Sequence, residues 1–214
     1  MDVMTIVSLI GTAVLSYLMG AIPTAYIFGR VLKGIDIRTQ GSGNVGATNA
    51  FRILGKGPGT AVLVIDILKG AIAVAVVAGY LSPDTTGRIV AAVAAVCGHN
   101  WTCFLNFKGG KGIATTLGVL IGFTVAIPET RGAVGLCVLT WVVSFLMTAI
   151  VSVSSLVTAV VLPIFMLVFG APLALVVLSI LFCFFVVLRH RPNIQRLLNG
   201  QEAKVSFLWH SKKQ

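Results

Sequence analysis

The chain contains little charge and very little acid. Only 10% of its 214 residues are charged and six are Asp or Glu, whereas a soluble domain carries about 25% charged residues. It has no HExxH sequence and no cluster of Cys and His, and its four cysteines form no CxxC pair. These absences disfavour zinc sites, disulfide frameworks and metal-dependent hydrolysis, so we expect neither a metal nor a cofactor.

Apolar residues are abundant in this chain. They make up 57% of the chain, and the mean hydropathy is +1.00. A helix that crosses a hydrocarbon core of roughly 30 Å needs about 20 apolar residues. The sequence therefore predicts one all-α domain over residues 1–214, a polytopic membrane protein with about seven transmembrane helices. The predicted spans are 4–29, 58–80, 87–105, 112–128, 132–151, 154–170 and 172–188.

Two of these spans, 112–128 and 154–170, are short, so a count of five is the alternative if neighbouring segments are re-entrant. Thirteen of the sixteen Lys and Arg residues lie in one set of loops. Basic residues mark cytoplasmic loops, which predicts an outer N-terminus and a cytoplasmic C-terminus. We therefore attribute the net charge of +10 to contact with an anionic membrane leaflet and not to nucleic-acid binding. We also expect the first span to be retained and residues 193–214 to include a short interfacial helix.

Three polar, glycine-rich segments interrupt the apolar chain, and all are predicted to face the cytoplasm. The first, Gly41–Asn49, has three glycines, which permit positive φ angles and close backbone approach to a ligand. Successive N–H groups in such a loop form an anion-binding nest. The alternative is a glycine-rich turn at a helix end. The side chains that add polar groups here are Ser42, Asn44, Thr48, Asn49 and Arg52.

The second segment places Lys108, Gly109, Gly110 and Lys111 directly before an apolar helix. Cations, unpaired N–H groups and a positive helix end then coincide, as in phosphate sites. The alternative is an ordinary pair of cytoplasmic lysines, and His99 upstream is by itself more often structural.

The third segment has His190 and Asn193 on either side of Pro192, which is expected at the start of a helix. The alternative for this segment is a basic flank that stops transfer of the chain. None of the three segments contains paired carboxylates, which disfavours glycosidase chemistry.

A few polar residues lie within the spans themselves. Asp66 and Lys69 are three residues apart, and we expect them to form a structural ion pair, because a charge in a membrane interior needs a partner. Ser152, Ser154 and Ser155 leave two alternatives open. They bond back to their own helix, or they face a substrate.

Taken together, the segments resemble the motifs of the acyl-phosphate-dependent glycerol-3-phosphate acyltransferases of bacterial membranes. The family's first motif, GSGNxGATN, is matched by Gly41–Asn49 in full. Its second, around GHxF…FKGGKGxAT, is matched by Gly98, His99 and 107–115, and its third, HRxNIxRLLxGxE, by 190–202. The chain departs from the family where Asn100 and Trp101 replace Phe-Pro. It departs again at 149–151, where no basic-aromatic pair precedes the serine.

The resemblance implies a reaction. An acyl phosphate gives its acyl group to the 1-hydroxyl of glycerol 3-phosphate, which yields lysophosphatidic acid and phosphate in the first acylation of bacterial phospholipid synthesis. Thioester-using acyltransferases carry an HX₄D motif, and neither His99 nor His190 is followed by Asp five residues later. The implied partners are the two substrates and membrane lipid, in the bacterial inner membrane with the site towards the cytoplasm. No oligomeric state is predicted.

The resemblance also implies the site. Its implied catalytic residues are Ser42, Lys111, His190 and Asn193. The implied substrate-binding residues are Gly41, Gly43, Asn44, Gly46, Thr48, Asn49, Arg52, Lys108, Gly109, Gly110 and Ser152. Two chemical schemes stay open: direct attack, in which a substrate phosphate takes the hydroxyl proton, and an acyl-enzyme on Ser42. An anion transporter and a noncatalytic lipid-binding protein are the alternative function classes.

Overall fold

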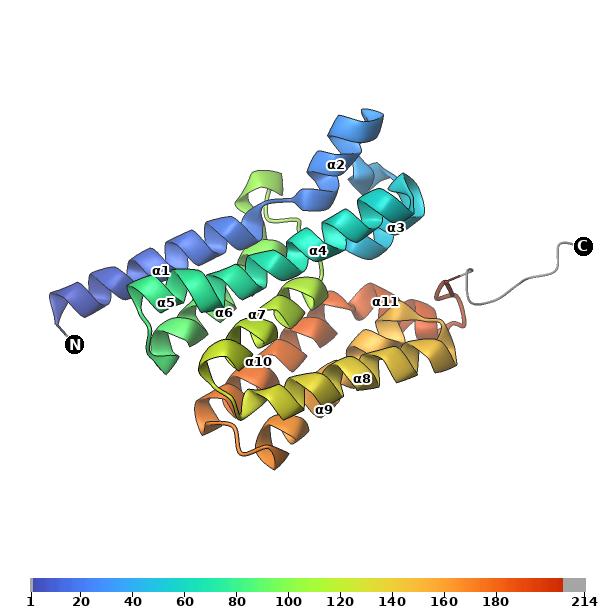
Figure 1. Ribbon diagram of the computed structural model, residues 1–214. Helices are drawn as coiled ribbons and strands as arrows, with labels where there is room; N and C mark the ends of the chain where they lie inside the picture. Colours follow the sequence, from blue (N-terminus) through green and yellow to red (C-terminus); the bar gives the residue numbers. More distant parts are fainter. Residues whose placement is uncertain (1, 206–214) are drawn as a thin grey trace, which may run out of the picture. The chain divides into compact units, whose positions relative to one another are not determined.

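A computed structural model describes residues 2–205, and the regular secondary structure of that part is helical (Figure 1). The segment before the boundary at Pro128 forms one compact unit, and the segment from Glu129 onward forms a second. The first unit contains α1 (Val3–Ala21), α2 (Thr24–Lys33), η1 (Ile37–Thr39), α3 (Ala47–Leu54), α4 (Lys56–Ile72), η2 (Ala73–Val77), α5 (Ala78–Leu81), α6 (Thr85–Asn100), η3 (Cys103–Leu105) and α7 (Ile113–Ala126). The second contains α8 (Thr130–Thr148), α9 (Val151–Val168), α10 (Leu173–Arg189) and α11 (Arg191–Leu198). A single domain over 1–214 stays a prediction.

Five helical segments in the described part are long and apolar enough to cross a membrane: Val3–Lys33, Lys56–Leu81, Thr85–Leu105, Thr130–Thr148 and Val151–Val168. A sixth is formed if α10 and α11, which bend by 61°, count as one span. Helix α7 has 14 residues, which at 1.5 Å per residue reach about 21 Å, less than a hydrocarbon core of roughly 30 Å. The polytopic helical class is confirmed, whereas seven crossings and the orientation of the termini stay predictions.

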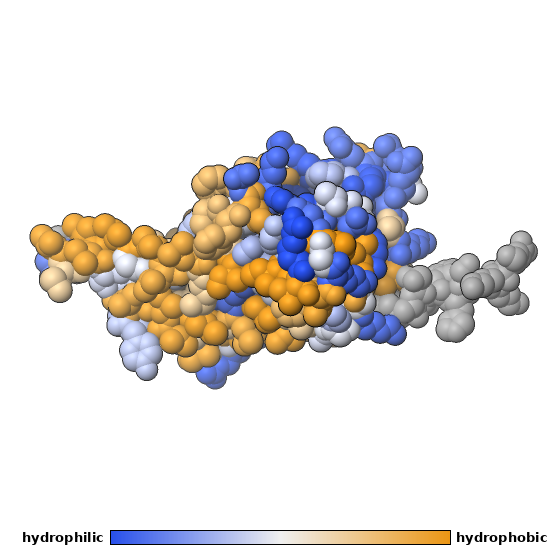
Figure 2. Space-filling model, turned by 90° about the horizontal axis from the view of Figure 1, so that it is seen from above, coloured by the Kyte–Doolittle hydropathy of each residue, from blue (hydrophilic) through white to orange (hydrophobic). Residues whose placement is uncertain are grey.

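The surface in Figure 2 fits a membrane protein. Hydrophobic residues dominate the visible face along α1, and hydrophilic residues gather over α2 and α3. Exposed apolar side chains on α1 include Val7, Ile10 and Val14. Of the predicted interfacial helix, α11 covers the beginning, and the segment from Phe207 to Trp209 lies outside the described residues.

Glycines bring the helices of the first unit into backbone contact. A Cβ added at Gly118 of α7 would lie 1.8 Å from the Ile67 carbonyl oxygen of α4, and one at Gly70 would lie 2.1 Å from the Thr115 oxygen. Helices α1 and α6 meet in the same way, since a Cβ at Gly98 would lie 2.2 Å from the Tyr17 oxygen. Small residues permit this close packing of helices in lipid, where the hydrophobic effect does not drive association.

The span predicted over 4–29 is broken in the middle. Helix α1 ends at Ala21 and α2 begins at Thr24, because Pro23 has no N–H and restricts the residue before it. The carbonyl groups released at the break find other partners. Thr102 Oγ1 donates to the Ala21 oxygen at 2.5 Å, and Lys69 Nζ donates to the Ile22 oxygen. A break in a membrane-spanning helix needs such replacements.

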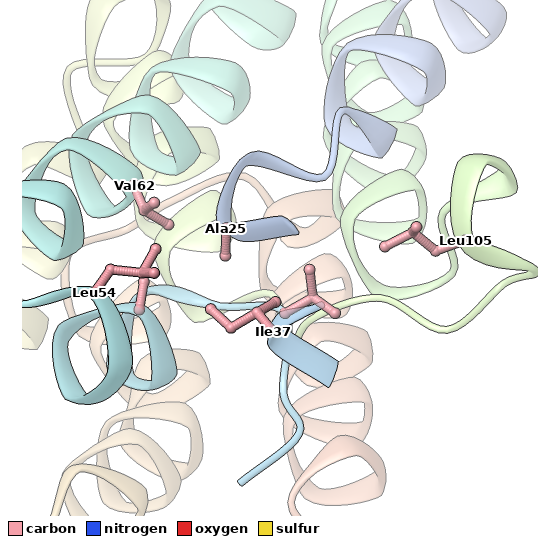
Figure 3. Packing of buried hydrophobic residues seen from close by; sticks show 7 residues of the cluster. Ala25, Ile37, Leu54, Val62 and Leu105 are labelled. Carbon is pink, nitrogen blue, oxygen red and sulfur yellow. The ribbon is translucent and has the colours of Figure 1, made fainter. Parts of the chain in front are cut away.

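Beyond the break, a compact hydrophobic cluster supports the first glycine-rich segment (Figure 3). It joins α2, η1, α3, α4 and η3 through Ala25, Ile37, Val45, Ala50, Leu54, Val62 and Leu105. Ile37 of η1 and Val45 lie on either side of Gly41 and Gly43 in the sequence, and both belong to this cluster. The loop between them is therefore anchored at both ends in the cluster.

In the second unit, α8 and α10 pack against α9. Trp141 of α8 stacks on Phe145 and donates from Nε1 to Ser155 Oγ of α9 at 3.3 Å. Helix α11 begins with Pro192 in its first turn, as predicted from the sequence. After α11, the N–H of Val205 donates to the Ala149 oxygen, which returns the chain to the start of α9.

Candidate active site

The first motif forms a tight loop in which backbone angles and close contacts require glycine at two positions. Gly41 and Gly43 have φ angles of 58° and 69°, in the left-handed region that other residues rarely adopt. A Cβ at Gly41 would also lie 2.5 Å from Asn49 Oδ1, and one at Gly43 would lie 2.9 Å from the Arg38 oxygen. Two of the three glycines thus use the positive φ angles that the sequence permits, whereas Gly46 has a φ angle of −134°.

Asn49 holds the loop together. Its side chain is buried, its Oδ1 accepts from the Ser42 N–H at 3.0 Å, and its Nδ2 donates to the oxygens of Ile37 and Gln40 at 3.3 and 3.1 Å. All of these bonds serve the loop backbone. The geometry therefore gives Asn49 a positioning role in the loop, and its direct contact with a ligand stays a prediction.

An ion pair braces the same loop from the side of η1. Arg38 Nη2 lies 2.7 Å from Asp36 Oδ2, and both Arg38 and Arg30 lie over the Tyr26 ring. The hydrogen bond from Arg38 lowers the pKa of the Asp36 carboxyl to about 2. Asp36 thus stays charged, and the brace stays intact, down to a pH near that value.

The loop leaves a set of donors for a ligand. The Ser42 side chain is exposed and makes no hydrogen bond with any described residue. The N–H groups of Ala47 and Thr48 precede the first hydrogen bonds of α3, which Asn49 and Ala50 donate to the Gly46 oxygen. Arg52, exposed in the last turn of α3, has no ion pair within 2–205. These groups suit an anion.

The second motif folds back onto the end of α6. The N–H groups of Gly109 and Gly110 donate to the oxygens of Asn100 and His99 at 3.2 and 3.0 Å. A Cβ at Gly109 would lie 2.1 Å from the His99 oxygen, and one at Gly110 would lie 2.1 Å from His99 Nε2. Close packing on His99 and Asn100 therefore requires these two glycines, a reason that the sequence did not reveal.

Several polar groups around the start of α7 make no hydrogen bond with the described residues. Gly112, with a φ of 79°, precedes the helix and provides no side-chain cap. Within the described part, both polar atoms of the buried Asn100 side chain and the Thr115 hydroxyl have no hydrogen-bond partner. A Cβ at Gly112 would lie 2.6 Å from Asn100 Oδ1, so this amide faces the helix start. Buried polar groups left unpaired are costly, and they often mark a binding site.

The two motifs meet at one small, partly open cleft. Val45 of the first motif and Gly109 and Gly110 of the second line it, together with His99 and the break between α1 and α2. Lys108 is exposed beside it, and Lys111 is half-buried at the start of α7. The first unit thus brings residues of the first two motifs to one cleft, and a shared active site stays a prediction.

In the second unit, three side chains donate hydrogen bonds to one carboxylate, that of Glu202. Its Oε1 accepts from Ser152 Oγ at 2.7 Å and from Asn193 Nδ2, and its Oε2 accepts from Arg196 Nε at 2.7 Å. Ser152 and Asn193 were both predicted as site residues, and the structure brings them together. Glu202 was not predicted, although it lies inside the third motif match, which was the available signal.

The surroundings of Glu202 favour its charged form. Burial raises its pKa, but the hydrogen bonds from Asn193, Ser152 and Arg196 outweigh burial, so its pKa lies below the usual 4.5. With a lowered pKa in the folded state, the carboxylate stabilises the unit at pH values above 4.5. That contribution is lost as the pH falls through the folded-state pKa.

The remaining polar residues of this unit divide into two groups. Ser154 and Ser155 donate to the oxygens of Ile150 and Val151, four residues earlier. They therefore take the first of the two alternatives open to them, whereas Ser152 reaches outside its helix. His190 is buried between α10 and α11, with Nδ1 2.8 Å from the Val186 oxygen. That contact fixes the ring at the start of α11.

Replacing Glu202 by glutamine is expected to lower the free energy of unfolding at pH 7 by about 1–2 kcal/mol, because charged hydrogen bonds become neutral. The decline in stability below pH 4.5 should also become flatter. Thermal unfolding in detergent between pH 4 and 8 measures both effects. Glu129→Gln, an exposed acid of the same unit, is the control, and equal behaviour of the two variants would contradict the role of Glu202.

Replacing Gly110 by alanine is expected to lower kcat/KM by about 100-fold, since moving a site loop by about 1 Å has this effect. The added Cβ cannot coexist with the His99 ring. Gly57→Ala is the matched control, because nothing lies within 4 Å of a Cβ there. Steady-state turnover measures the difference. Wild-type turnover in Gly110→Ala would contradict the packing.

Known proteins resemble this chain in sequence and in fold. Residues 10–200 match the family model described as glycerol-3-phosphate acyltransferase. A glycerol-3-phosphate acyltransferase of Halalkalibacterium halodurans is 43% identical over 196 residues, which cover 89% of this chain and 92% of that protein. One from Synechococcus sp. (strain JA-3-3Ab) is 44% identical over 193 residues, covering 90% and 91%.

Two solved structures are similar to this fold. The crystal structure of PlsY (YgiH), an integral membrane glycerol 3-phosphate acyltransferase, in its glycerol 3-phosphate form has a TM-score of 0.85 and 34% identity. The match covers 96% of this chain and all of that chain. The lysophosphatidic acid form has a TM-score of 0.81 and 35% identity, covering 92% and 95%. The chain is therefore an integral membrane acyltransferase. The chain belongs to the glycerol-3-phosphate acyltransferase family.

Proposed function

We propose that this acyltransferase uses an acyl phosphate as donor and esterifies the 1-hydroxyl of glycerol 3-phosphate. Both substrates carry phosphate. The observation that carries the proposal is the pairing of two glycine loops on one cleft, together with the exposed donors and cations of the same two motifs. The glycerol 3-phosphate and lysophosphatidic acid forms of the related PlsY structures match the proposed acceptor and product.

In the proposed reaction the 1-hydroxyl oxygen attacks the acyl carbonyl carbon. A new ester C–O bond forms, the bond between the acyl carbon and the phosphate oxygen breaks, and the hydroxyl proton passes to a substrate phosphate. Inorganic phosphate and lysophosphatidic acid leave. Phosphate is a good leaving group, so the protein's main contribution is to position two anions and to stabilise the oxyanion.

The first unit supplies the proposed donor site. Backbone N–H groups of Ala47 and Thr48, with Lys111, bind the acyl-donor phosphate. Ser42 lies exposed beside them in the loop that Asn49 holds. Arg52 is proposed to bind the phosphate of glycerol 3-phosphate, for which its guanidinium is suited. The other predicted ligands of the first two motifs, Gly41, Gly43, Asn44, Gly46, Lys108, Gly109 and Gly110, shape these loops or add charge.

The second unit contains three further residues that are proposed to contact substrate. These residues are Ser152, His190 and Asn193, and within this unit Glu202 holds Ser152 and Asn193 by hydrogen bonds. Because Glu202 already accepts three hydrogen bonds, it is a poor general base, and a substrate phosphate is the better proton acceptor. The proposed setting is the bacterial cytoplasmic membrane, with the site towards the cytoplasm.

A donor comparison tests this function. Purified protein in lipid receives glycerol 3-phosphate and either an acyl phosphate or the coenzyme A thioester with the same chain. The proposal expects lysophosphatidic acid from the acyl phosphate and at least about 100-fold less from the thioester, since the site is built for phosphate. Equal rates, or product from the thioester alone, would refute the donor assignment.

A further inference from the structure

A buried ion pair lies behind the second motif, on α4. Lys69 Nζ is 2.7 Å from Asp66 Oδ1, and both side chains are less than 5% exposed. The Thr24 hydroxyl closes a triangle with them, since it accepts from Lys69 and donates to Asp66 at 3.0 Å. The pair predicted from the sequence is confirmed. A buried pair is weak evidence for stability in itself, because desolvation offsets the attraction.

The acid of this pair also faces a histidine. His99 Nδ1 lies 4.0 Å from Asp66 Oδ1, with only 7% of the His99 side chain exposed. The opposite ring nitrogen, Nε2, lies 2.1 Å from the position that a Cβ added at Gly110 would take. The ring therefore stands between the Asp66 carboxylate and the Gly109–Gly110 turn, whose N–H groups bond to the oxygens of Asn100 and His99.

Lys69 fixes the other side of the same region. It donates to the Ile22 oxygen at the break between α1 and α2, and Ile22, Thr24, His99, Gly109 and Gly110 all line the small cleft. Helix α4 also contacts α7 directly through Gly70, the residue after Lys69. Helix α4 thus contacts three parts of this region: the Ile22 oxygen in the cleft wall, the His99 ring, and α7, the helix that follows Lys111.

We propose that Asp66 acts through His99 as a positioning residue for the Gly109–Lys111 turn, with Lys69 and Thr24 holding the carboxylate in place. Neither Asp66 nor His99 touches substrate in this account. The inference rests on the proposed function only where turnover is the readout. A misplaced turn would withdraw Lys111 and the α7 N–H groups from the transition state, so kcat should fall while substrate KM values change little.

The first test reads out turnover in Asp66→Asn, His99→Ala and the double variant. Each single variant is expected to lower kcat by roughly 10- to 100-fold, with KM for both substrates within about threefold of wild type. The double variant should be no worse than the poorer single variant by more than about threefold, because both act on one turn. Val119→Ala, a buried apolar truncation on α7, is the control that lowers stability without lowering kcat.

A second test does not depend on activity. Hydrogen–deuterium exchange of the Gly109 and Gly110 amides should accelerate by about tenfold in Asp66→Asn, because the turn opens more often. Amides of α8 should exchange as in wild type. Unchanged exchange of the turn, or additive losses in the double variant, would overturn the positioning role. An inactive wild type with accelerated exchange in the variant would instead reject the proposed function and keep this inference.

Discussion

Lys111→Ala is expected to lower kcat/KM by roughly 100- to 1,000-fold, the usual loss when a site loses one donor that stabilises developing negative charge. Lys111 directly follows the packed Gly109–Gly110 turn and precedes Gly112 and the first turn of α7. Its ammonium group therefore adds a full charge beside the partial positive charge of a helix start. Steady-state kinetics of purified protein with both substrates measures the loss.

Lys56→Ala is the matched control. Lys56 is an exposed lysine in the first turn of α4, outside both glycine loops, and its removal should leave turnover unchanged. Far-ultraviolet circular dichroism should show equal helix content in both variants. Turnover of Lys111→Ala within about threefold of wild type would remove Lys111 from the site, because a charge that contacts the reacting groups is worth more than that.

Gly118→Ala is expected to lower the free energy of unfolding by about 3 kcal/mol or more, through overpacking between α4 and α7. The added Cβ would lie 1.8 Å from the Ile67 oxygen, a backbone atom that cannot rotate away. The helices must separate, which also moves the start of α7. Reversible unfolding in mixed detergent micelles measures the change.

Gly135→Ala provides the control with the opposite sign. Gly135 lies within α8, and nothing is within 4 Å of a Cβ there. Alanine is the better helix former, so this variant should be neutral or more stable by up to about 1 kcal/mol. Equal effects of the two substitutions would contradict the close contact between α4 and α7.

Features that depend on local chemistry could be predicted from the sequence. The pairing of Asp66 with Lys69 followed from the cost of an unpaired charge in a membrane. The start of α11 near Pro192 followed from the fixed φ angle of proline, and the glycines of the first motif followed from their permitted backbone angles. The break between α1 and α2 had a signal in Pro23, but the hydropathy of the span concealed it.

Features that depend on distant contacts could not be predicted. Gly109 and Gly110 read as phosphate-loop glycines, and only the fold shows that His99 and Asn100 occupy the space beside them. Glu202 collects a hydrogen bond from Ser152, a residue fifty positions earlier. No spacing rule connects residues so far apart. Asn49 was predicted to bind substrate because its amide suits phosphate, and its bonds to the loop backbone become visible only in three dimensions.

The position of Ser42 keeps the choice between two reaction schemes open to experiment. Its hydroxyl is exposed and bonds to no described residue. Within residues 2–205 it therefore lacks the adjacent base that activates a serine nucleophile. Direct transfer between the two substrates is accordingly the proposed scheme.

An omission experiment tests the central claim most directly. Purified protein in lipid is mixed rapidly with an acyl phosphate, with or without glycerol 3-phosphate, and phosphate and lysophosphatidic acid are both quantified. Direct transfer predicts one phosphate per lysophosphatidic acid in the complete mixture and no release above the uncatalysed rate without the acceptor. A burst of one phosphate per enzyme without glycerol 3-phosphate would establish an acyl-enzyme, and no release in the complete mixture would contradict the acyl-phosphate reaction itself.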